Sequence, residues 1–414
     1  MPARACLPVT AGRACLPCLL PVAYSPARAP MSDDRWSDAD RAFMAEALAL
    51  AVGVPDRTWP NPPVGAVVVK DGRVVGRGAH AGCGRPHAEI VALDEAGEAA
   101  RGATLYVTLE PCNHTGRTGP CAPAVAAAGV RRVVVAMRDP NPAVLGGGCR
   151  HLRDCGLAVA VGCLAGQALD LVWPFVASDG FARPYVELKT ATSLDGRFAP
   201  VGARPGGPAP VYLTGEAARR DVHRRRRRVD VVLVGEGTVR ADRPRLDGRL
   251  AAGASDVPAA EPLPAYVDTD LSWTGGLPAT RYLVFAGEEA RGAPGGAAVA
   301  ADGGEVVYCR TRDGRVDPAD LVRRLAARGL MTLMVEGGPR LAASFLAAGL
   351  VDRWLRYEAP VVLGAGLGWP EAPAAADAAL HGAFTVTATV PLDADLLTIL
   401  DRNPFAAALG RVTL

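Results

Sequence analysis

The sequence predicts two α/β domains in succession along a chain of 414 residues. This length suits two or three domains of ordinary size. Half of the residues are hydrophobic and 21% are charged, so each domain can bury a core. Strand-like apolar runs alternate with helical patterns, as in layered α/β folds with a mixed sheet. We expect domains over 34–180 and 181–414, after an extension, 1–33, that is disordered or wrongly included in the chain.

The first domain is predicted to begin with a helix over 37–52. Ser37 can cap this helix, and Asp38 and Asp40 suit its first turn. A hairpin follows, because two apolar strands flank Asp71-Gly72, a typical hairpin turn. The expected elements are strands over 64–70 and 73–78, a helix over 87–95, a strand over 104–109, a helix over 121–128, and strands over 132–137 and 159–161.

The second domain repeats this alternation without repeating the motifs. Its expected elements are a strand over 185–190, a helix over 216–228, strands over 229–234 and 330–335, and helices over 318–328 and 340–348. The stretch 250–304 is rich in Ala, Gly and Pro, and we expect strands joined by loose loops there. Gly337-Gly338 separates the strand over 330–335 from the last helix.

Charge and cysteine content exclude several classes of protein. The net charge of +2 gives no overall attraction to nucleic acid or membranes. No run of about 18 apolar residues is present, so no transmembrane helix is predicted. Ten cysteines in so long a chain do not indicate a disulfide scaffold.

We expect Met31 to be the natural start of the protein. We also expect the protein to be cytoplasmic, to act on a small molecule and to form a homo-oligomer.

A metal site is predicted from His87, Cys112 and Cys121. One imidazole and two thiolates leave the fourth tetrahedral position of Zn²⁺ open for water, whose pKa the metal lowers. Glu89 lies two residues beyond His87, close enough to shuttle protons without binding the metal. His-x-Glu or Pro-Cys alone is often accidental, but their order here favours a zinc deaminase. The spacing from Cys112 to Cys121 is wider than the Cys-x-x-Cys of many such enzymes.

In the second domain, the strand over 330–335, Gly337-Gly338 and the following helix suit phosphate binding. Glycines let a phosphate approach the backbone, and a helix N-terminus presents free N–H groups. Such a turn can equally be a plain connection between a sheet and a helix. Hydride transfer from a nicotinamide needs little more from the protein than orientation and phosphate binding.

The chain resembles the bifunctional deaminase/reductase family of riboflavin biosynthesis over nearly all of residues 40–414. The first-domain motifs are PNP (60–62), VGAVV (64–68), GRGAH (76–80), PHAE (86–89), TLEPCNHTGRTGPC (108–121) and DPNP (139–142). The second-domain motifs are VELKTATSLDG (186–196), VGEGTVRAD (234–242) and VEGG (335–338). The resemblance implies a cytidine-deaminase-like α/β/α layered domain followed by a dihydrofolate-reductase-like α/β domain.

The resemblance also implies zinc and NADPH as cofactors. Deamination of 2,5-diamino-6-ribosylamino-4(3H)-pyrimidinone 5′-phosphate would precede reduction of the ribosyl group, giving 5-amino-6-ribitylamino-uracil 5′-phosphate. The implied deaminase residues are His87, Cys112 and Cys121 for zinc, Glu89 for catalysis, and Asn61, His80 and His114 for substrate. From the residues alone, Asn61 can also be a turn residue and His80 a hydrogen-bonding residue at a strand end.

For the reductase, the implied contacts are carried over motif by motif. The cofactor contacts are Ala191, Tyr212, Thr238, Asp242, Gly338, Pro339, Arg340, Leu341, Ala342, Ala343 and Ser344. The substrate contacts are Arg226, Leu246, Arg249 and Glu336, with the two arginines as a clamp for the ribotide phosphate. Tyr212 can stack on an aromatic cofactor.

Five positions depart from the family pattern, and one of them is Tyr212, which stands near where the family usually has a tryptophan. Gly119 stands where a second proline is common, and Gly147 where a basic residue is common. In the reductase half, Pro210 offers no hydroxyl for a substrate hydrogen bond, and Arg243 replaces a second acid after Asp242. These departures leave open the alternative that the chain is a monofunctional deaminase, whose second domain only binds ligand or drives oligomerisation.

The arginine run 224–228 leaves a second alternative, a deaminase that acts on nucleic acid. Aromatic residues that commonly interleave such surfaces are missing, which argues against it. Because the run lies in a predicted helix, its side chains point all around the axis. We therefore expect a solvated helix with one or two phosphate contacts.

Overall fold

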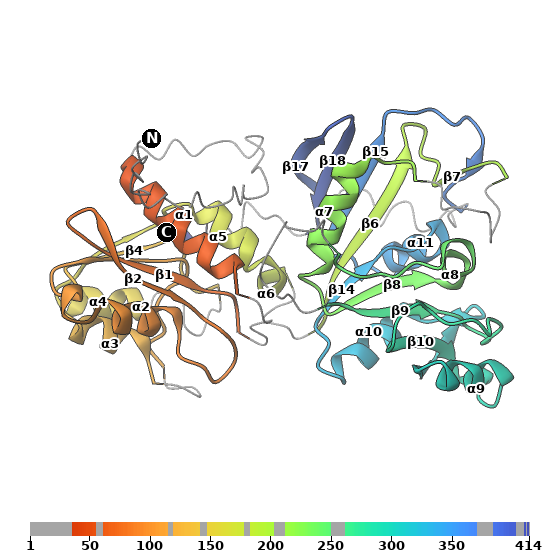
Figure 1. Ribbon diagram of the computed structural model, residues 1–414, viewed down its shortest axis with the longest axis horizontal. Coiled ribbons are helices and arrows are strands. Elements are labelled where there is room, and N and C mark those ends of the chain that lie inside the picture. The colour runs from red at the N-terminus through yellow and green to blue at the C-terminus, as the bar shows by residue number, and fades with distance from the viewer. Residues whose placement is uncertain are drawn as a thin grey trace, which may run out of the picture.

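The computed structural model describes residues 35–54, 61–114, 119–140, 147–177, 183–202, 212–249, 261–370, 384–402, 410 and 412–413. These residues form two lobes, each built around its own sheet (Figure 1). Residues 1–33, Pro210 and the expected boundary at 180/181 lie outside the described residues. No helix in the described part of the chain is both long and apolar enough to cross a membrane.

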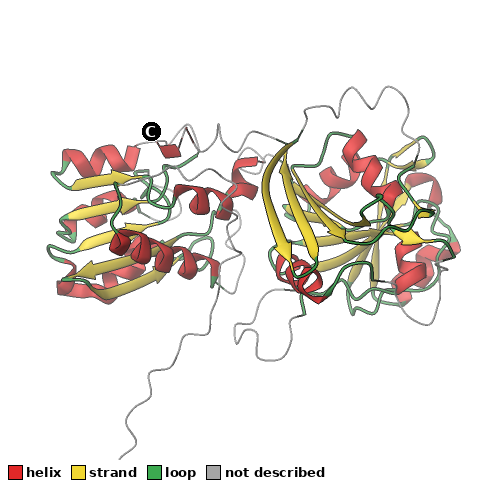
Figure 2. Ribbon diagram, turned by 90° about the horizontal axis from the view of Figure 1, so that it is seen from above, coloured by secondary structure: helices red, strands yellow, loops and turns green. Residues whose placement is uncertain are grey.

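The first lobe contains a mixed five-stranded sheet between two helical layers (Figure 2). Its strands, in the spatial order β2-β1-β3-β4-β5, are β1 (Gly65–Lys70), β2 (Arg73–Ala79), β3 (Thr104–Val107), β4 (Arg132–Val135) and β5 (Ala158–Val161). β1 runs antiparallel to both β2 and β3, whereas β3, β4 and β5 are parallel. Asp71 and Gly72 both adopt positive φ, which confirms the predicted hairpin turn.

Helices cover both faces of this sheet. They are α1 (Asp38–Val52), α2 (Ala88–Ala96), α3 (Cys121–Ala127), α4 (Gly147–Asp154), α5 (Ala165–Leu171) and α6 (Trp173–Ala177), with a 3₁₀ turn at Gly97–Ala100. α1 and α5 pack on one face, and α2, α3 and α4 pack on the other. Ser37 caps α1 in a capping box with Asp40, as predicted. The helices α4, α5 and α6 were not predicted.

The second lobe contains a nine-stranded sheet in the order β11-β10-β9-β8-β14-β6-β15-β18-β17. Its strands are β6 (Tyr185–Ser193), β8 (Val231–Gly235), β9 (Leu263–Val267), β10 (Tyr282–Gly287), β11 (Gly304–Cys309), β14 (Thr332–Val335), β15 (Arg353–Ala359), β17 (Thr385–Leu392) and β18 (Asp395–Asp401). The seven strands from β11 to β15 are parallel, and the β17–β18 hairpin continues the sheet antiparallel. Two small ribbons pair β7 (Ala199–Pro200) with β16 (Gly366–Leu367), and β12 (Thr311–Arg312) with β13 (Arg315–Val316).

The helices of this lobe are α7 (Glu216–Arg226), α8 (Glu236–Asp242), α9 (Pro294–Ala301), α10 (Pro318–Ala326) and α11 (Pro339–Ala347), with a 3₁₀ turn at Glu288–Ala290. α10 and α11 pack on one face of the sheet, and α7, α8 and α9 on the other. The expectation of only strands and loops across 250–304 was wrong at α9. This helix starts with Pro294 at its first turn, where a proline is compatible with helix.

Several contacts between described residues join the lobes. α6 lies between the two sheets (Figure 1), and Trp173 shares the core of the first lobe with Tyr185, the first residue of β6. Arg353 on β15 pairs with Asp170 on α5 at 3.1 Å. Val412 is buried in the first-lobe core, where its carbonyl accepts a hydrogen bond from the backbone N–H of Arg138.

Candidate active sites

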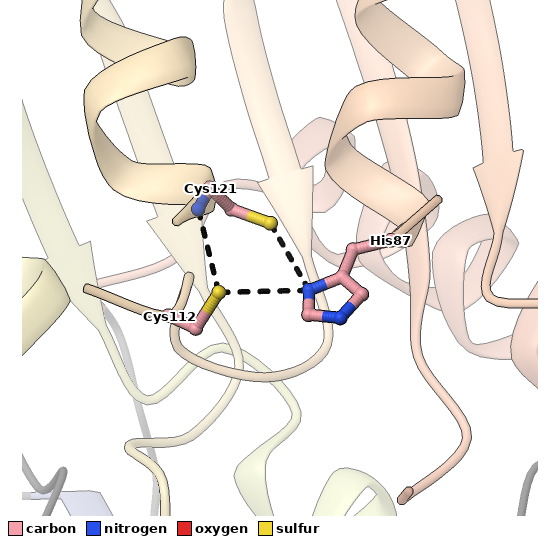
Figure 3. Close-up of side chains that lie close together, drawn as sticks. All are labelled: His87, Cys112 and Cys121. Carbon is pink, nitrogen blue, oxygen red and sulfur yellow. Dashed lines mark hydrogen bonds between the residues drawn. The ribbon is translucent and has the colours of Figure 1, made fainter. Parts of the chain in front are cut away.

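The predicted metal ligands come from three separate elements of the first lobe. His87 is the N-cap residue of α2, Cys112 lies in the loop after β3, and Cys121 is the first residue of α3. Because both helices begin beside the end of β3, the three side chains point toward one another (Figure 3). Their ligand atoms all lie within 4.8 Å of one another.

The spacing of these atoms fits a tetrahedral metal. His87 Nδ1 lies 3.1 Å from Cys121 Sγ and 3.5 Å from Cys112 Sγ. Zinc–sulfur and zinc–nitrogen bonds of about 2.3 and 2.0 Å give tetrahedral edges of about 3.5–3.8 Å. The set therefore offers one nitrogen and two sulfur ligands to a zinc ion, with a fourth position for another ligand.

The electrostatics of the site favour a thiolate at Cys112. The Cys121 thiol donates to Cys112, as does the Cys121 backbone N–H at 3.3 Å, and His87 adds a further hydrogen bond. Together these donors lower the pKa of the Cys112 thiol to about 4. In return, hydrogen bonding to Cys112 raises the pKa of His87. A thiolate at this position is the form that binds a metal.

Glu89 lies in the first turn of α2 and is only 3% exposed. Burial raises the pKa of its carboxyl group to about 7, and the group shares a hydrogen bond with the Cys121 thiol. A carboxyl group held near neutral pKa beside the metal ligands can both accept and donate a proton.

Asn61 and His80 lie together next to the triad, whereas His114 does not. The His80 ring packs edge-on against His87, with 5.0 Å between centroids. Its Nδ1 donates to the Pro86 carbonyl, so its Nε2 accepts from the Asn61 amide at 3.0 Å. His114 is exposed in the loop after Cys112, and no contact with the triad is found among the described residues.

Glu110, which the sequence alone did not single out, stabilises the loop that carries Cys112. Its buried carboxylate accepts hydrogen bonds from the backbone N–H of Cys149, at 2.8 Å, and of Asp139, at 3.2 Å. Gly148 lets α4 pack closely here, because a Cβ atom at this position would lie 1.8 Å from the Pro111 carbonyl oxygen. Glu110 stands in the TLEPC motif, but only the fold reveals what it contacts.

In the second lobe, the predicted cofactor residues of α8 and α11 follow two parallel strands that lie side by side. The strand β14 leads directly into Glu336 and the N-terminus of α11, and its neighbour β8 leads into α8. Gly338 is the N-cap of α11, and a Cβ atom there would meet nothing within 4 Å. Gly337 differs, because its Cβ would lie 2.6 Å from the Leu341 side chain. A phosphate can therefore approach at Gly338, while Gly337 serves packing.

The other residues that are expected to contact the cofactor differ in how deeply they are buried. Pro339 and Ala342 are buried in the lobe, and the Ser344 hydroxyl donates to the Leu341 carbonyl within α11. The remaining members are half-buried or exposed: Ala191, Tyr212, Thr238, Asp242, Arg340, Leu341 and Ala343. Tyr212 is 60% exposed, and the Arg219 guanidinium covers one face of its ring.

The expected substrate residues Arg226, Arg249 and Glu336 are joined through Asp247. Arg226 forms a two-pronged ion pair with Glu336, at 2.6 and 2.9 Å, and also donates to the Asp247 carbonyl. The Asp247 carboxylate pairs with Arg249. Leu246 is only 1% exposed and adopts a positive φ of +54°, so the structure does not show it open to a ligand.

The expectation of a solvated arginine helix was wrong for part of the run 224–228. The side chains of Arg225 and Arg226 are each only 12% exposed. Arg225 pairs with the buried Asp221, which also accepts from the Tyr357 hydroxyl. A buried carboxylate of the same helix therefore pairs with Arg225, and the carboxylate of Glu336, after β14, pairs with Arg226.

Lys189, in the middle of β6, was also missed. Burial lowers the pKa of its ammonium group, and Glu336 and Arg226 are the charged groups that act on it. Although burial opposes ionisation of Glu336, the charges of Arg226 and Lys189 lower its pKa. The signal available in the sequence was a lysine in a predicted strand, two residues after the acidic Glu187.

Both lobes match known protein families. Residues 37–137 match the cytidine and deoxycytidylate deaminase zinc-binding region, and residues 184–376 match the RibD C-terminal domain. The riboflavin biosynthesis protein RibD of Aquifex aeolicus is 38% identical over 334 residues, which cover 79% of this chain and 89% of that protein. The chain belongs to the RibD family.

Other RibD proteins agree in sequence and structure. Escherichia coli RibD is 37% identical over 78% of this chain and 89% of its own length. The Acinetobacter baumannii RibD structure has a TM-score of 0.69 at 33% identity, and covers 88% of this chain and 99% of that one. A Thermotoga maritima deaminase/reductase structure has a TM-score of 0.68 at 31% identity, with the same coverage. The chain is thus a bifunctional RibD deaminase/reductase of riboflavin biosynthesis, with a deaminase fold followed by a reductase fold.

Proposed function

We propose that the first lobe deaminates 2,5-diamino-6-ribosylamino-4(3H)-pyrimidinone 5′-phosphate and that the second reduces the ribosyl group of the product with NADPH. The convergence of His87, Cys112 and Cys121 beside a buried Glu89 carries the first half of the proposal. The second half is supported by the open N-terminus of α11 next to the Arg226–Glu336 pair.

For deamination, His87, Cys112 and Cys121 would hold zinc, which when bound lowers the pKa of a coordinated water to about 7. Glu89 takes a proton from the attacking water and passes it to the departing amine, so that ammonia leaves. Asn61 contacts the pyrimidine, and His80 fixes the orientation of the Asn61 amide through their hydrogen bond. His114 contacts the substrate from the loop after Cys112.

For reduction, NADPH when bound supplies the hydride. The backbone from Gly338 to Ser344 binds its phosphates, and Ala191, Tyr212, Thr238 and Asp242 contact the rest of the cofactor. Arg226 and Arg249 bind the substrate phosphate, and binding requires Arg226 to exchange part of its pairing with Glu336. Leu246 and Glu336 contact the rest of the substrate.

We further propose that the enzyme is a cytoplasmic homo-oligomer with domains over 34–180 and 181–414. Exposed apolar side chains support the assembly, since Val201 is 74% and Val362 70% exposed, each next to the β7–β16 ribbon. Light scattering of the purified protein measures the number of subunits, and a purely monomeric enzyme would contradict this part.

One reaction tests the two activities together. Protein, zinc, NADPH and the diaminopyrimidinone ribotide are combined, and the products are identified by mass spectrometry. We expect the ribityl product with one NADPH consumed for each molecule formed. Accumulation of the deaminated ribosyl compound alone would mean that the second lobe is inactive, as Pro210 and Arg243 allow. An unchanged ribotide would contradict the assigned substrate.

A further inference from the structure

A cavity of about 330 Å³ opens at the edge strand β5 of the first sheet, lined by Arg153 of α4 on the face that carries the zinc-ligand triad and by Trp36 and Arg132 on the opposite face. The described residues that line it include four arginines and no carboxylate. These arginines are Arg35, Arg132, Arg138 and Arg153. Trp36 and the strand residues Val159–Val161 supply its apolar wall.

The arginines differ in how their charge is balanced. Arg132 pairs with the buried Asp40, at 2.8 Å, and so is neutralised. Arg153 has a single long hydrogen bond of 3.4 Å to the Val159 carbonyl. The Nε of Arg138 is buried and has no hydrogen-bond partner within the described residues. Neither Arg138 nor Arg153 forms an ion pair with any described carboxylate.

We propose that this cavity binds a small phosphorylated anion. Guanidinium groups match phosphate oxygens with paired hydrogen bonds, and a buried N–H without an acceptor is costly unless a ligand supplies one. A volume of about 330 Å³ lies at the small end of ligand pockets, which span roughly 300–1,000 Å³. The ligand is thus the size of a sugar phosphate, with its organic part against the apolar wall.

This site is separate from both proposed catalytic sites. The triad and Glu89 belong to the layer of α2 and α3, whereas Arg132 and Arg138 share the opposite face with Trp36 and α1. A bound anion would link α4, through Arg153, to the end of β4, through Arg138. The backbone of Arg138 also holds Val412, so the ligand would stabilise this attachment of the chain.

The test is a calorimetric titration of the full-length, zinc-loaded protein with inorganic pyrophosphate. It uses an Arg249→Met background, which removes a proposed phosphate contact of the reductase site. Zinc content is measured before and after, because pyrophosphate also chelates zinc. We expect saturable binding that Arg153→Met and Arg138→Met each weaken at least tenfold. Arg150→Met is the matched control, since Arg150 lies exposed on the same helix as Arg153 and does not line the cavity.

Two results would overturn the proposal. One is the absence of saturable binding at millimolar pyrophosphate, which would mean that the chain itself satisfies these arginines. The other is an equal loss of affinity in the Arg150→Met control, which would indicate attraction by net charge alone. Circular dichroism and NADPH binding confirm that each variant is folded. Arg153→Met is expected to leave both catalytic reactions unchanged.

Discussion

At the residue scale, Glu89 differs sharply from the other carboxylates of α2. It is 3% exposed and has a pKa raised to about 7 by burial, whereas Asp94 and Glu95 are exposed at the other end of the helix. The N-cap position of His87 fixes this difference, because it places Glu89 in the first turn, facing Cys121. A proton shuttle needs this burial beside the metal ligands.

Replacing Glu89 with Gln should therefore abolish deamination while the metal remains bound. The amide keeps the size of the side chain but cannot carry a proton, so we expect a loss of at least about 100-fold in kcat. Metal analysis and ammonia release provide the two measurements. Asp94→Asn, on the same helix, is expected to behave as wild type. Full deaminase activity in Glu89→Gln would refute the assigned role.

In the second lobe, Lys189 resembles Glu89 of the first lobe, because it too is a charged group among buried neighbours. It lies beside Glu336 and 5.8 Å from the centre of the Tyr357 ring. Its positive charge lowers the pKa of Glu336 and so favours the ionised carboxylate there. If the proposed substrate site at Glu336 is right, a change at Lys189 should affect the reduction and not the deamination.

We expect Lys189→Met to lower kcat of the reduction by about one to two orders of magnitude, the cost of losing a charged hydrogen-bonding group. The deaminated ribosyl compound should then accumulate, while the affinity for NADPH is retained. Lys70→Met, at the end of β1, serves as control. A parallel loss of NADPH binding and of reduction would instead show that Lys189 only maintains the local structure.

Some site residues are recognisable from residue type and order along the chain, whereas others are recognisable only from their contacts in the fold. His87, Cys112 and Cys121 carry a chemical signature in their type and order, and the fold brings them together. Lys189 acquires its surroundings from α7 and β14, which are distant in sequence. Such partners become visible only when the strands are placed side by side.

At the element scale, α11 shows how one turn separates packing from binding. Gly337 has no room for a side chain because Leu341 fills the space, whereas Gly338 faces open space at the first N–H groups of the helix. Free N–H groups at a helix start favour a phosphate. Two adjacent glycines therefore have different functions.

This difference predicts that an alanine at position 338 weakens NADPH binding, whereas an alanine at position 337 lowers the stability of the protein. Gly338→Ala should raise the Kd for NADPH at least about tenfold by narrowing the approach to the N–H groups, and should cost less than about 1 kcal/mol of stability. Gly337→Ala should destabilise the protein by about 1–3 kcal/mol through overpacking against Leu341. Fluorescence titration with NADPH and denaturant unfolding measure the two quantities. Similar effects from both variants would argue against a phosphate site at Gly338.

Elements with strong local signals were predicted well, and those dominated by tertiary contacts were not. The hairpin at Asp71-Gly72 and the capped helix α1 follow from turn and capping residues alone. α4 begins with Gly147-Gly148, poor helix formers, because a larger residue at 148 would strike the Pro111 carbonyl. Its helical state is imposed by packing, which the sequence pattern does not display.

At the scale of the whole molecule, Arg353 ties the lobes together from inside the second one. It is 5% exposed, pairs with the fully buried Asp401 at 2.7 Å, and reaches Asp170 on α5. Asp170 is different, since its side chain remains 48% exposed. Both aspartates pair with the Arg353 guanidinium. If that guanidinium were removed, solvent would still reach Asp170, whereas Asp401 would remain a buried charge.

We therefore expect Arg353→Met to destabilise the protein by about 3–5 kcal/mol, because the buried Asp401 carboxylate loses this cation and keeps hydrogen bonds such as that from the Thr387 hydroxyl. Asp170→Asn removes only the contact between lobes and should cost less than about 1 kcal/mol, the range of exposed ion pairs. Denaturant unfolding, followed by circular dichroism, measures both. Equal destabilisation by the two variants would show that the energy lies in the bridge between the lobes rather than in the buried pair. In that case the two active sites would depend on each other for stability, and a variant of either lobe would impair both reactions.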